Sequence, residues 1–324
     1  MDFKEASRKI KQLFQKYGGE IRLVFLALIF FWIYLFLYRN PLVTELAPVG
    51  QNGVQLPAYI VANQPDEAVN YWFIRALALG KRASIPIELQ TLVPQKIHPR
   101  STTIINDMLA PIGFPGIIFL YGSLLSLILL FLPIAWFNIL AVSITPFLGA
   151  LTPILLYFFL RRFFDKKIAE TSALLLWIQP AWWYYASRPF QHSTLFLFLL
   201  LLSLNALARV CFTQFERAFV RLSWWIVTGL FLGLTIYIRP VELVWVSFAA
   251  GLFLFWFRKG WNKKDLVFFG MGLLIAGAIF FITNILFYGA AFGTGYVQPT
   301  AIGTSGIITG ASVGLGGRGL FSVL

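Results

Sequence analysis

Two adjacent carboxylates are the residues best suited to acid–base chemistry. Asp66 and Glu67 follow Pro65 and open a stretch in which apolar residues recur with helical spacing. An accessible carboxylate at such a position can act as general base on an incoming hydroxyl group. The same position is also a common N-cap, which fixes a carboxylate in place without requiring chemistry. The sequence leaves both roles open for Asp66, and neither excludes the other.

Cations and polar rings form a second set of candidates, for binding a phosphate or another part of a substrate. A guanidinium can bind two phosphate oxygens at once, and a charge near a membrane boundary is costly unless it is paired. Two alternatives stay open: Arg188 could simply extend towards water, and Arg239 could pair with Glu242, three residues later. The candidate binding residues are His98, Arg100, Arg188, His192, Arg239 and Tyr296.

Metal and nucleotide chemistry are not predicted. His98 and His192 are the two histidines of the chain, whereas a metal site usually needs three or four ligands. The glycines in FGTGY at 292–296 lack the preceding strand and the lysine of a phosphate-binding loop. This disfavours an ATP-driven pump or a soluble nucleotide-sugar enzyme within this stretch. With one cysteine, Cys211, an intramolecular disulfide is impossible.

The composition requires lipid as the solvent for most of the chain. The 324 residues are 59% apolar and 12% charged, with a mean hydropathy of +0.77. A soluble domain carries roughly 25% charged residues. The net charge of +13 comes from lysines and arginines clustered between apolar runs. Because membrane topology places cations there, nucleic acid is not a predicted partner.

Seven apolar runs predict an all-α polytopic membrane protein. Several are slightly shorter than the ~20 residues that cross a bilayer, but flanking basic and aromatic residues can extend them. The first follows a basic N-terminus and has no small-residue cleavage site after it, so it is expected to be a retained signal-anchor helix. The runs are 23–38, 134–160, 168–186, 193–208, 222–238, 241–257 and 266–288.

The distribution of cations predicts the sidedness of the helices. Most cations lie before the first run and in the loops after the second, fourth and sixth, whereas the two loops between these hold only Arg188 and Arg239. Positive loops stay in the cytoplasm, so the N-terminus is expected there too. The apolar stretch 112–132 then cannot cross the membrane. It contains Gly113 and Pro115, ends before Pro133, and is predicted to be a re-entrant or interfacial helix.

This topology divides the chain into a cytoplasmic basic segment, 1–22, and a single membrane-embedded domain, 23–324. Residues 39–111 become the first external loop, and the Gly-rich residues 289–319 become another. Within the first loop, 66–80 reads as an amphipathic helix on the membrane surface. Its polar face is expected to carry Asp66, Asn70 and Arg75. Its apolar face is expected to carry Ala68, Val69, Trp72, Phe73, Ala76, Leu77 and Leu79.

Four segments together resemble the polyprenol-phosphate-sugar-dependent glycosyltransferases of the GT-C class, which include protein O-mannosyltransferases and lipid A aminoarabinose transferases. They are PDEA at 65–68, KIHPRS followed by an apolar stretch, RRFFDKK followed by YYASRP, and NILFYGAAFGTGY at 284–296. The chain departs from the family at Gln191 or His192, where an acidic residue is usual. It is also expected to be C-terminally truncated, since the family continues with further membrane helices.

The resemblance implies a membrane glycosyltransferase that moves a hexose or pentose from a polyprenyl-phosphate donor, with inversion, to a hydroxyl on the external face of the plasma membrane. Asp66, with Glu67, would be catalytic, and Arg239, with Arg100 or Arg188, would hold the leaving phosphate. The implied partners are the bilayer, the lipid-linked donor and a protein, glycan or lipid acceptor. No cofactor is implied beyond the donor substrate, and no metal.

Two other classes of protein also fit a polytopic chain with basic loops. A transporter or lipid flippase usually has polar or broken helices near the bilayer midplane, often in two matched halves. No internal duplication is visible here, and polar residues inside the apolar runs are few. A non-catalytic scaffold would need neither an acidic pair nor several arginines on one side. Both alternatives are therefore ranked below the enzyme.

Overall fold

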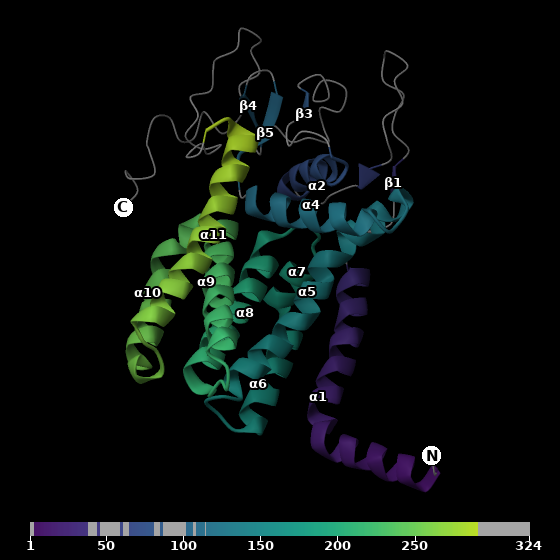
Figure 1. Cartoon of the computed structure of the whole chain (residues 1–324). Helices are drawn as coiled ribbons and strands as arrows, with labels where there is room; N and C mark the ends of the chain where they lie inside the picture. The colour runs from purple at the N-terminus through teal and green to yellow at the C-terminus, as the bar shows by residue number, and fades with distance from the viewer. Residues whose placement is uncertain are drawn as a thin grey trace.

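The computed structural model of the chain describes residues 3–37, 44–45, 59–60, 65–80, 85–86, 102–105, 108–113 and 115–290. Long helices run side by side, and shorter elements lie at one of their ends (Figure 1). Within these residues, five helical segments are long and apolar enough to cross a membrane, namely 18–37, 134–160, 192–212, 218–238 and 263–288. The predicted class, an all-α polytopic membrane protein, is confirmed.

The helices differ clearly in length. The longer ones are α1 (Phe3–Leu37), α5 (Phe137–Leu160), α8 (His192–Phe212), α9 (Ala218–Ile238) and α11 (Lys263–Tyr288). The shorter ones are α2 (Pro65–Ala78), α4 (Pro115–Leu129), α6 (Lys166–Ile178), α7 (Pro180–Ala186) and α10 (Leu243–Trp256). Single 3-10 turns η2 (Ile134–Trp136), η3 (Pro240–Glu242) and η4 (Arg258–Gly260) connect some of them.

Two of the seven predicted spanning runs form shorter helices than expected. The run 168–186 is divided into α6 and α7, because Gln179 is extended before Pro180 (φ −65°, ψ 124°). Proline disfavours helical geometry in the residue before it and has no N–H to continue the ladder. The run 241–257 becomes η3 followed by the 14 residues of α10. All seven runs are helical, but five reach the length of a span.

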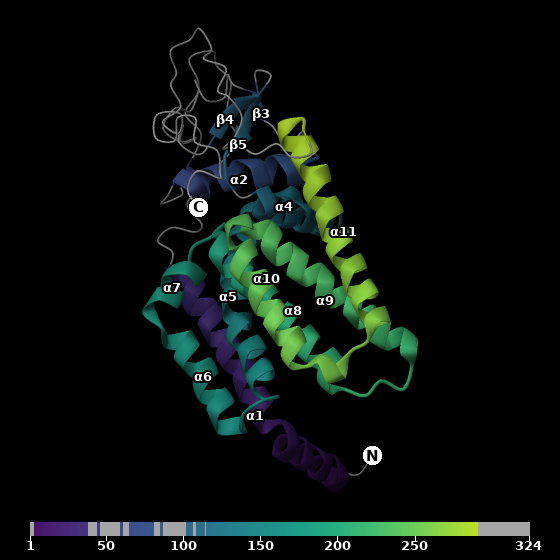
Figure 2. The same ribbon diagram turned by 90° about the vertical axis from the view of Figure 1, so that its left-hand side faces the viewer.

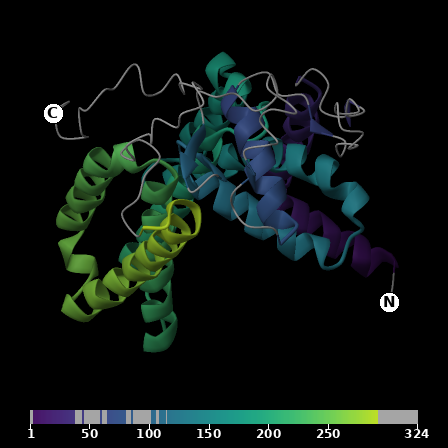
Figure 3. The ribbon, with the colours of Figure 1, turned by 90° about the horizontal axis from the view of Figure 1, so that it is seen from above.

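The apolar stretch 112–132 does not run beside the long helices. It forms α4, a helix of 15 residues that lies across one end of the bundle, next to α2 (Figures 1 and 2). Seen from that end in Figure 3, α2 lies over the long helices. The two short helices approach closely, since a Cβ added to Gly122 would come within 2.7 Å of the Leu77 side chain. This orientation agrees with the predicted interfacial or re-entrant helix.

The buried face of α2 differs from the one that its sequence pattern predicts. Asn70 was expected on the polar face, but its side chain is 9% exposed and donates to the backbone carbonyl of Phe190 at 3.1 Å. Tyr71 and Ile74, which were not among the expected apolar positions, are fully buried. The prediction for Asn70 was wrong because packing on other elements, and not lipid alone, decides which face of α2 is covered.

Short antiparallel strands accompany α2 and α4 in the segment 39–111, for which the sequence predicted an amphipathic helix. One pair joins β1 (Thr44–Glu45) to β2 (Tyr59–Ile60), and a second sheet has the order β3 (Ile85–Pro86), β5 (Met108–Pro111), β4 (Thr102–Ile105). The Tyr288 hydroxyl, at the end of α11, donates to the Pro111 carbonyl at 2.8 Å. This bond ties the second sheet to the bundle.

The two ends of the bundle carry different groups. The turns after α5, α8 and α10 lie at one end with the start of α1, whereas α2, α4 and the turns after α7 and α9 lie at the other (Figures 1 and 2). The cation-rich loops therefore share one end, as their sequence predicts. The candidate residues Asp66, Glu67, Arg188, His192 and Arg239 all belong to the opposite end.

Candidate active site

Glu67 lies in a closed polar cluster at the start of α2. Its side chain is 0% exposed, and its Oε1 is 3.1 Å from Nε of Arg188. The side-chain amide of Gln191 donates to the same oxygen at 3.3 Å. A buried carboxylate needs such partners, because an unpaired buried charge is very costly. The cluster joins α2 to the turn between α7 and α8, which is about 120 residues away in sequence.

Arg188 is anchored, which does not support the alternative that it merely extends towards water. Its side chain is 13% exposed. Besides Glu67, the guanidinium lies 4.5 Å from the centre of the Tyr184 ring and donates from Nη1 to the Tyr184 hydroxyl. Tyr184 is one helical turn earlier in the chain, so these contacts fix the guanidinium against the end of α7.

Asp66 has a different environment from its neighbour. Its side chain is exposed, and it lies in the first turn of α2, where the helix dipole favours a negative charge. The charges of Asp66, Arg239 and Glu242 all act on the imidazole of His192, the first residue of α8. Residues from α2, from the start of α8 and from the end of α9 are thus neighbours.

Arg239 forms the ion pair that its sequence spacing suggested. Its Nη2 is 2.9 Å from Oε1 of Glu242, and its guanidinium lies 5.6 Å from the centre of the Phe196 ring. The indole N–H of Trp245 donates to the other oxygen of Glu242. Nε of Arg239 has no hydrogen-bond partner among the described residues. With a side chain that is 29% exposed, Arg239 can still take up an anion.

Both arginines occupy helix ends because each precedes a proline. Arg188 is followed by Pro189, and Arg239 by Pro240. The residue before proline disfavours helical dihedrals, and Arg239 accordingly has φ −138° and ψ 83°. α7 ends at Ala186 and α9 at Ile238. The repeated Arg-Pro pair therefore places two guanidinium groups at the same end of the bundle.

The turn between α7 and α8 contains a strained residue. Phe190 has φ +64°, in the left-handed region that bulky side chains rarely adopt. Such a conformation costs roughly 1–3 kcal/mol and persists only where the surroundings hold it. Its N–H donates to the hydroxyl of Thr145 at 3.2 Å, and its carbonyl accepts from Asn70 at 3.1 Å. The turn that carries Arg188 and His192 is therefore held from two sides.

Three predicted binding residues lie outside the described residues. They are His98, Arg100 and Tyr296, and their roles stay predictions. The expectation that the chain has no dedicated metal site also stays a prediction. In the cluster at the start of α2, sequence reasoning missed Asn70 as a contact residue. Its spacing was a usable signal, since Asn70 follows Glu67 by three residues and so lies on the same side of a helix.

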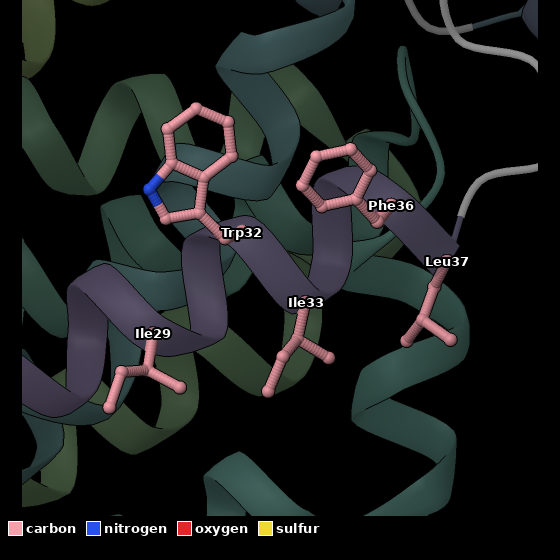
Figure 4. A pocket seen from close by; sticks show the side chains of 5 residues that line it. All are labelled: Ile29, Trp32, Ile33, Phe36 and Leu37. Carbon is pink, nitrogen blue, oxygen red and sulfur yellow. The ribbon is translucent and has the colours of Figure 1, made fainter.

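A depression on α1 is not part of this site. It is lined by Ile29, Trp32, Ile33, Phe36 and Leu37, none of which is charged (Figure 4). Trp32 and Phe36 are 53% and 73% exposed. Such a surface suits contact with lipid chains, and it offers no charged group to a phosphate.

Comparison with protein families matches residues 123–287, just over half of the 324-residue chain, to the family described as dolichyl-phosphate-mannose-protein mannosyltransferase. The chain belongs to this family. This member of the mannosyltransferase family is a multi-pass membrane glycosyltransferase of the GT-C type, which uses a polyprenyl-phosphate sugar donor. The matched range contains Arg188, His192 and Arg239 and begins after Asp66 and Glu67. No curated protein and no solved structure matches the chain.

Proposed function

We propose that the chain transfers a hexose or pentose from polyprenyl phosphate to a hydroxyl group at the end of the bundle that carries Asp66. The acceptor oxygen attacks the anomeric carbon from the side opposite the phosphate. A new glycosidic bond forms, the bond from that carbon to the phosphate oxygen breaks, and the configuration inverts. The acceptor proton passes to the Asp66 carboxylate, and the polyprenyl phosphate leaves with its negative charge.

One observation carries this proposal: an exposed carboxylate lies near a partly exposed guanidinium and an imidazole. Asp66 and Arg239 both lie within electrostatic range of His192, although the three residues come from different helix ends. Sugar transfer needs a base for the acceptor proton and a cation for the leaving phosphate. Asp66 would supply the base and Arg239 the cation.

The geometry favours different roles for the two members of the acidic pair. Glu67 is enclosed by Arg188 and Gln191, so we assign it to holding α2 and not to proton transfer. Both arginines pair with a glutamate, but the Arg188 pair is almost fully buried whereas Arg239 and Glu242 are partly exposed, so Arg239 is the better candidate for the leaving phosphate. His192 would donate a hydrogen bond to the same phosphate.

We place this site on the external face of the plasma membrane, with the N-terminus in the cytoplasm. The support is the segregation of charge: the cation-rich turns lie at the opposite end of the bundle, and cations in short loops stay in the cytoplasm. The acceptor would then be a protein, glycan or lipid hydroxyl exposed outside the cell.

Replacing Asp66 tests the proposal. Asp66→Asn keeps the shape and removes the base, so transfer of radiolabelled sugar from polyprenyl phosphate in isolated membranes should fall about 10²–10⁴-fold. The matched control is Glu216→Gln, an exposed carboxylate in the turn between α8 and α9, which should transfer at the wild-type rate. Wild-type turnover of Asp66→Asn, at equal amounts of inserted protein, would remove Asp66 from the mechanism.

A further inference from the structure

Side chains from two other helices form hydrogen bonds with the backbone of Phe190. Its N–H donates to Oγ1 of Thr145 on α5 at 3.2 Å, and its carbonyl accepts from Nδ2 of Asn70 on α2 at 3.1 Å. Oγ1 of Thr145 is also 3.0 Å from the hydroxyl of Tyr121 on α4. The side chain of Thr145 is 0% exposed, so water cannot replace these bonds. Both hydrogen-bonding groups of one backbone residue are therefore occupied by side chains distant in sequence.

These two hydrogen bonds explain how Phe190 keeps its unusual backbone angle. Among the described residues it is the one non-glycine residue with positive φ, and its side chain is 1% exposed. Glycine would adopt this angle without cost, but glycine could not supply the ring that packs 5.8 Å from Tyr71. The turn therefore uses external hydrogen bonds to stay left-handed while it retains an aromatic anchor.

The direction of the chain through Phe190 decides where the candidate site residues lie. Arg188 precedes it by two residues and reaches Glu67, and Gln191 follows it and reaches the same carboxylate. His192 then begins α8 beside the charges of Asp66 and Arg239. If Phe190 adopted a common negative φ, the segments on its two sides would diverge, and these contacts could not form together.

We infer that Asn70 and Thr145 are positioning residues for sugar transfer, because they hold Phe190 in the left-handed conformation that places Arg188, Gln191 and His192. The inference rests on the function proposed above. Neither residue touches the donor or the acceptor. Asn70 also lies one helical turn after Asp66, so its bond to Phe190 fixes the helix that carries the base to the turn that carries the binding residues.

The test is a pair of matched substitutions on one helix. Thr145→Val keeps the side-chain shape and removes the acceptor of the Phe190 N–H. Thr152→Val makes the same change seven residues later, where the hydroxyl is equally buried but donates only to the Leu148 carbonyl of its own helix, at 2.7 Å. Thr145→Ser restores the hydroxyl.

Two measurements decide the outcome. In sugar transfer, kcat of Thr145→Val should fall about tenfold to a hundredfold, as expected from a displaced binding group, while Thr152→Val and Thr145→Ser stay near wild type. All variants are compared at temperatures at which each is fully folded. In hydrogen–deuterium exchange, the amides of residues 187, 188 and 190–192 should exchange faster in Thr145→Val and not in Thr152→Val.

The second measurement does not depend on activity. If wild-type protein fails to transfer sugar, the proposed function fails. The exchange result still tests whether Thr145 holds the backbone of Phe190. If wild type transfers sugar, either an unchanged kcat or unchanged exchange in Thr145→Val overturns the positioning role.

Discussion

At the residue scale, the adjacent residues Asp66 and Glu67 lie in different environments because they point in different directions from the helix. Consecutive side chains of an α-helix point about 100° apart, so neighbours in sequence rarely share an environment. Here Asp66 is exposed, whereas Glu67 is fully buried against Arg188. The two adjacent acids therefore differ in access to solvent, and the packing of α2 decides which of them is exposed.

The ion pair between Glu67 and Arg188 is expected to matter more when one partner is removed than when both are. Buried pairs contribute little compared with apolar replacements, but a single deletion leaves a charge without a partner. Gln191 donates to the same carboxylate and would lose that bond as well.

A double-mutant cycle measures this coupling. Glu67→Gln alone should destabilise the protein by roughly 3 kcal/mol, because Arg188 keeps a buried and uncompensated charge. The variant Glu67→Gln/Arg188→Gln should recover part of that loss, as seen in thermal unfolding midpoints in detergent. Strictly additive effects of the two single substitutions would contradict a direct pair.

At the element scale, glycines set how closely α9 and α11 pack. A Cβ on Gly229 would lie 2.0 Å from the Phe269 carbonyl oxygen, and one on Gly272 would lie 2.1 Å from that of Ile226. The two backbones are thus in direct contact, as in small-residue interfaces between membrane helices. Since Arg239 directly follows the last residue of α9, this interface helps to fix the position of a candidate phosphate-binding residue.

Two alanine substitutions on α11 should separate close packing from helix propensity. Gly272→Ala forces α9 and α11 apart and should destabilise the protein by about 1–3 kcal/mol, as overpacking does. Gly270→Ala lies two residues away with nothing within 4 Å of its added Cβ, and it should be neutral or slightly stabilising. Thermal unfolding in one detergent compares them. Equal effects would mean that the close approach is not energetically important.

At the scale of the whole molecule, the cation-rich turns and the candidate site occupy opposite ends of the bundle. The turns after α5, α8 and α10 lie at one end, and α2 with the turns after α7 and α9 lies at the other (Figures 1 and 2). This separation brings five candidate residues from separate parts of the chain to the same end of the bundle.

Labelling with a membrane-impermeant thiol reagent tests the sidedness in intact cells. In a Cys211→Ser background, Ala290→Cys, just after α11, should be labelled from outside, because it lies at the end that carries the site. Lys263→Cys, at the start of α11, should be labelled only after permeabilisation. External labelling of Lys263→Cys would invert the topology and move the candidate site to the cytoplasm.

The sequence by itself determined the membrane class, the seven helical runs, the separate behaviour of the apolar stretch 112–132 and the shared end of the basic loops. These properties follow from sums over neighbouring residues, since partition into lipid depends on the composition of consecutive segments. Resemblance in short motifs also gave the family, which comparison confirmed.

Only the tertiary structure decided the burial of Glu67, the burial of Asn70 on α2 and the left-handed conformation of Phe190. Each depends on contacts between segments far apart in the chain: Glu67 with Arg188, Asn70 with Phe190, and Thr145 with Phe190. Local periodicity treats Asn70 as a surface residue because it counts hydrophobicity alone. A buried hydrogen bond offsets the cost of covering a polar group, and its partner cannot be read from neighbouring residues.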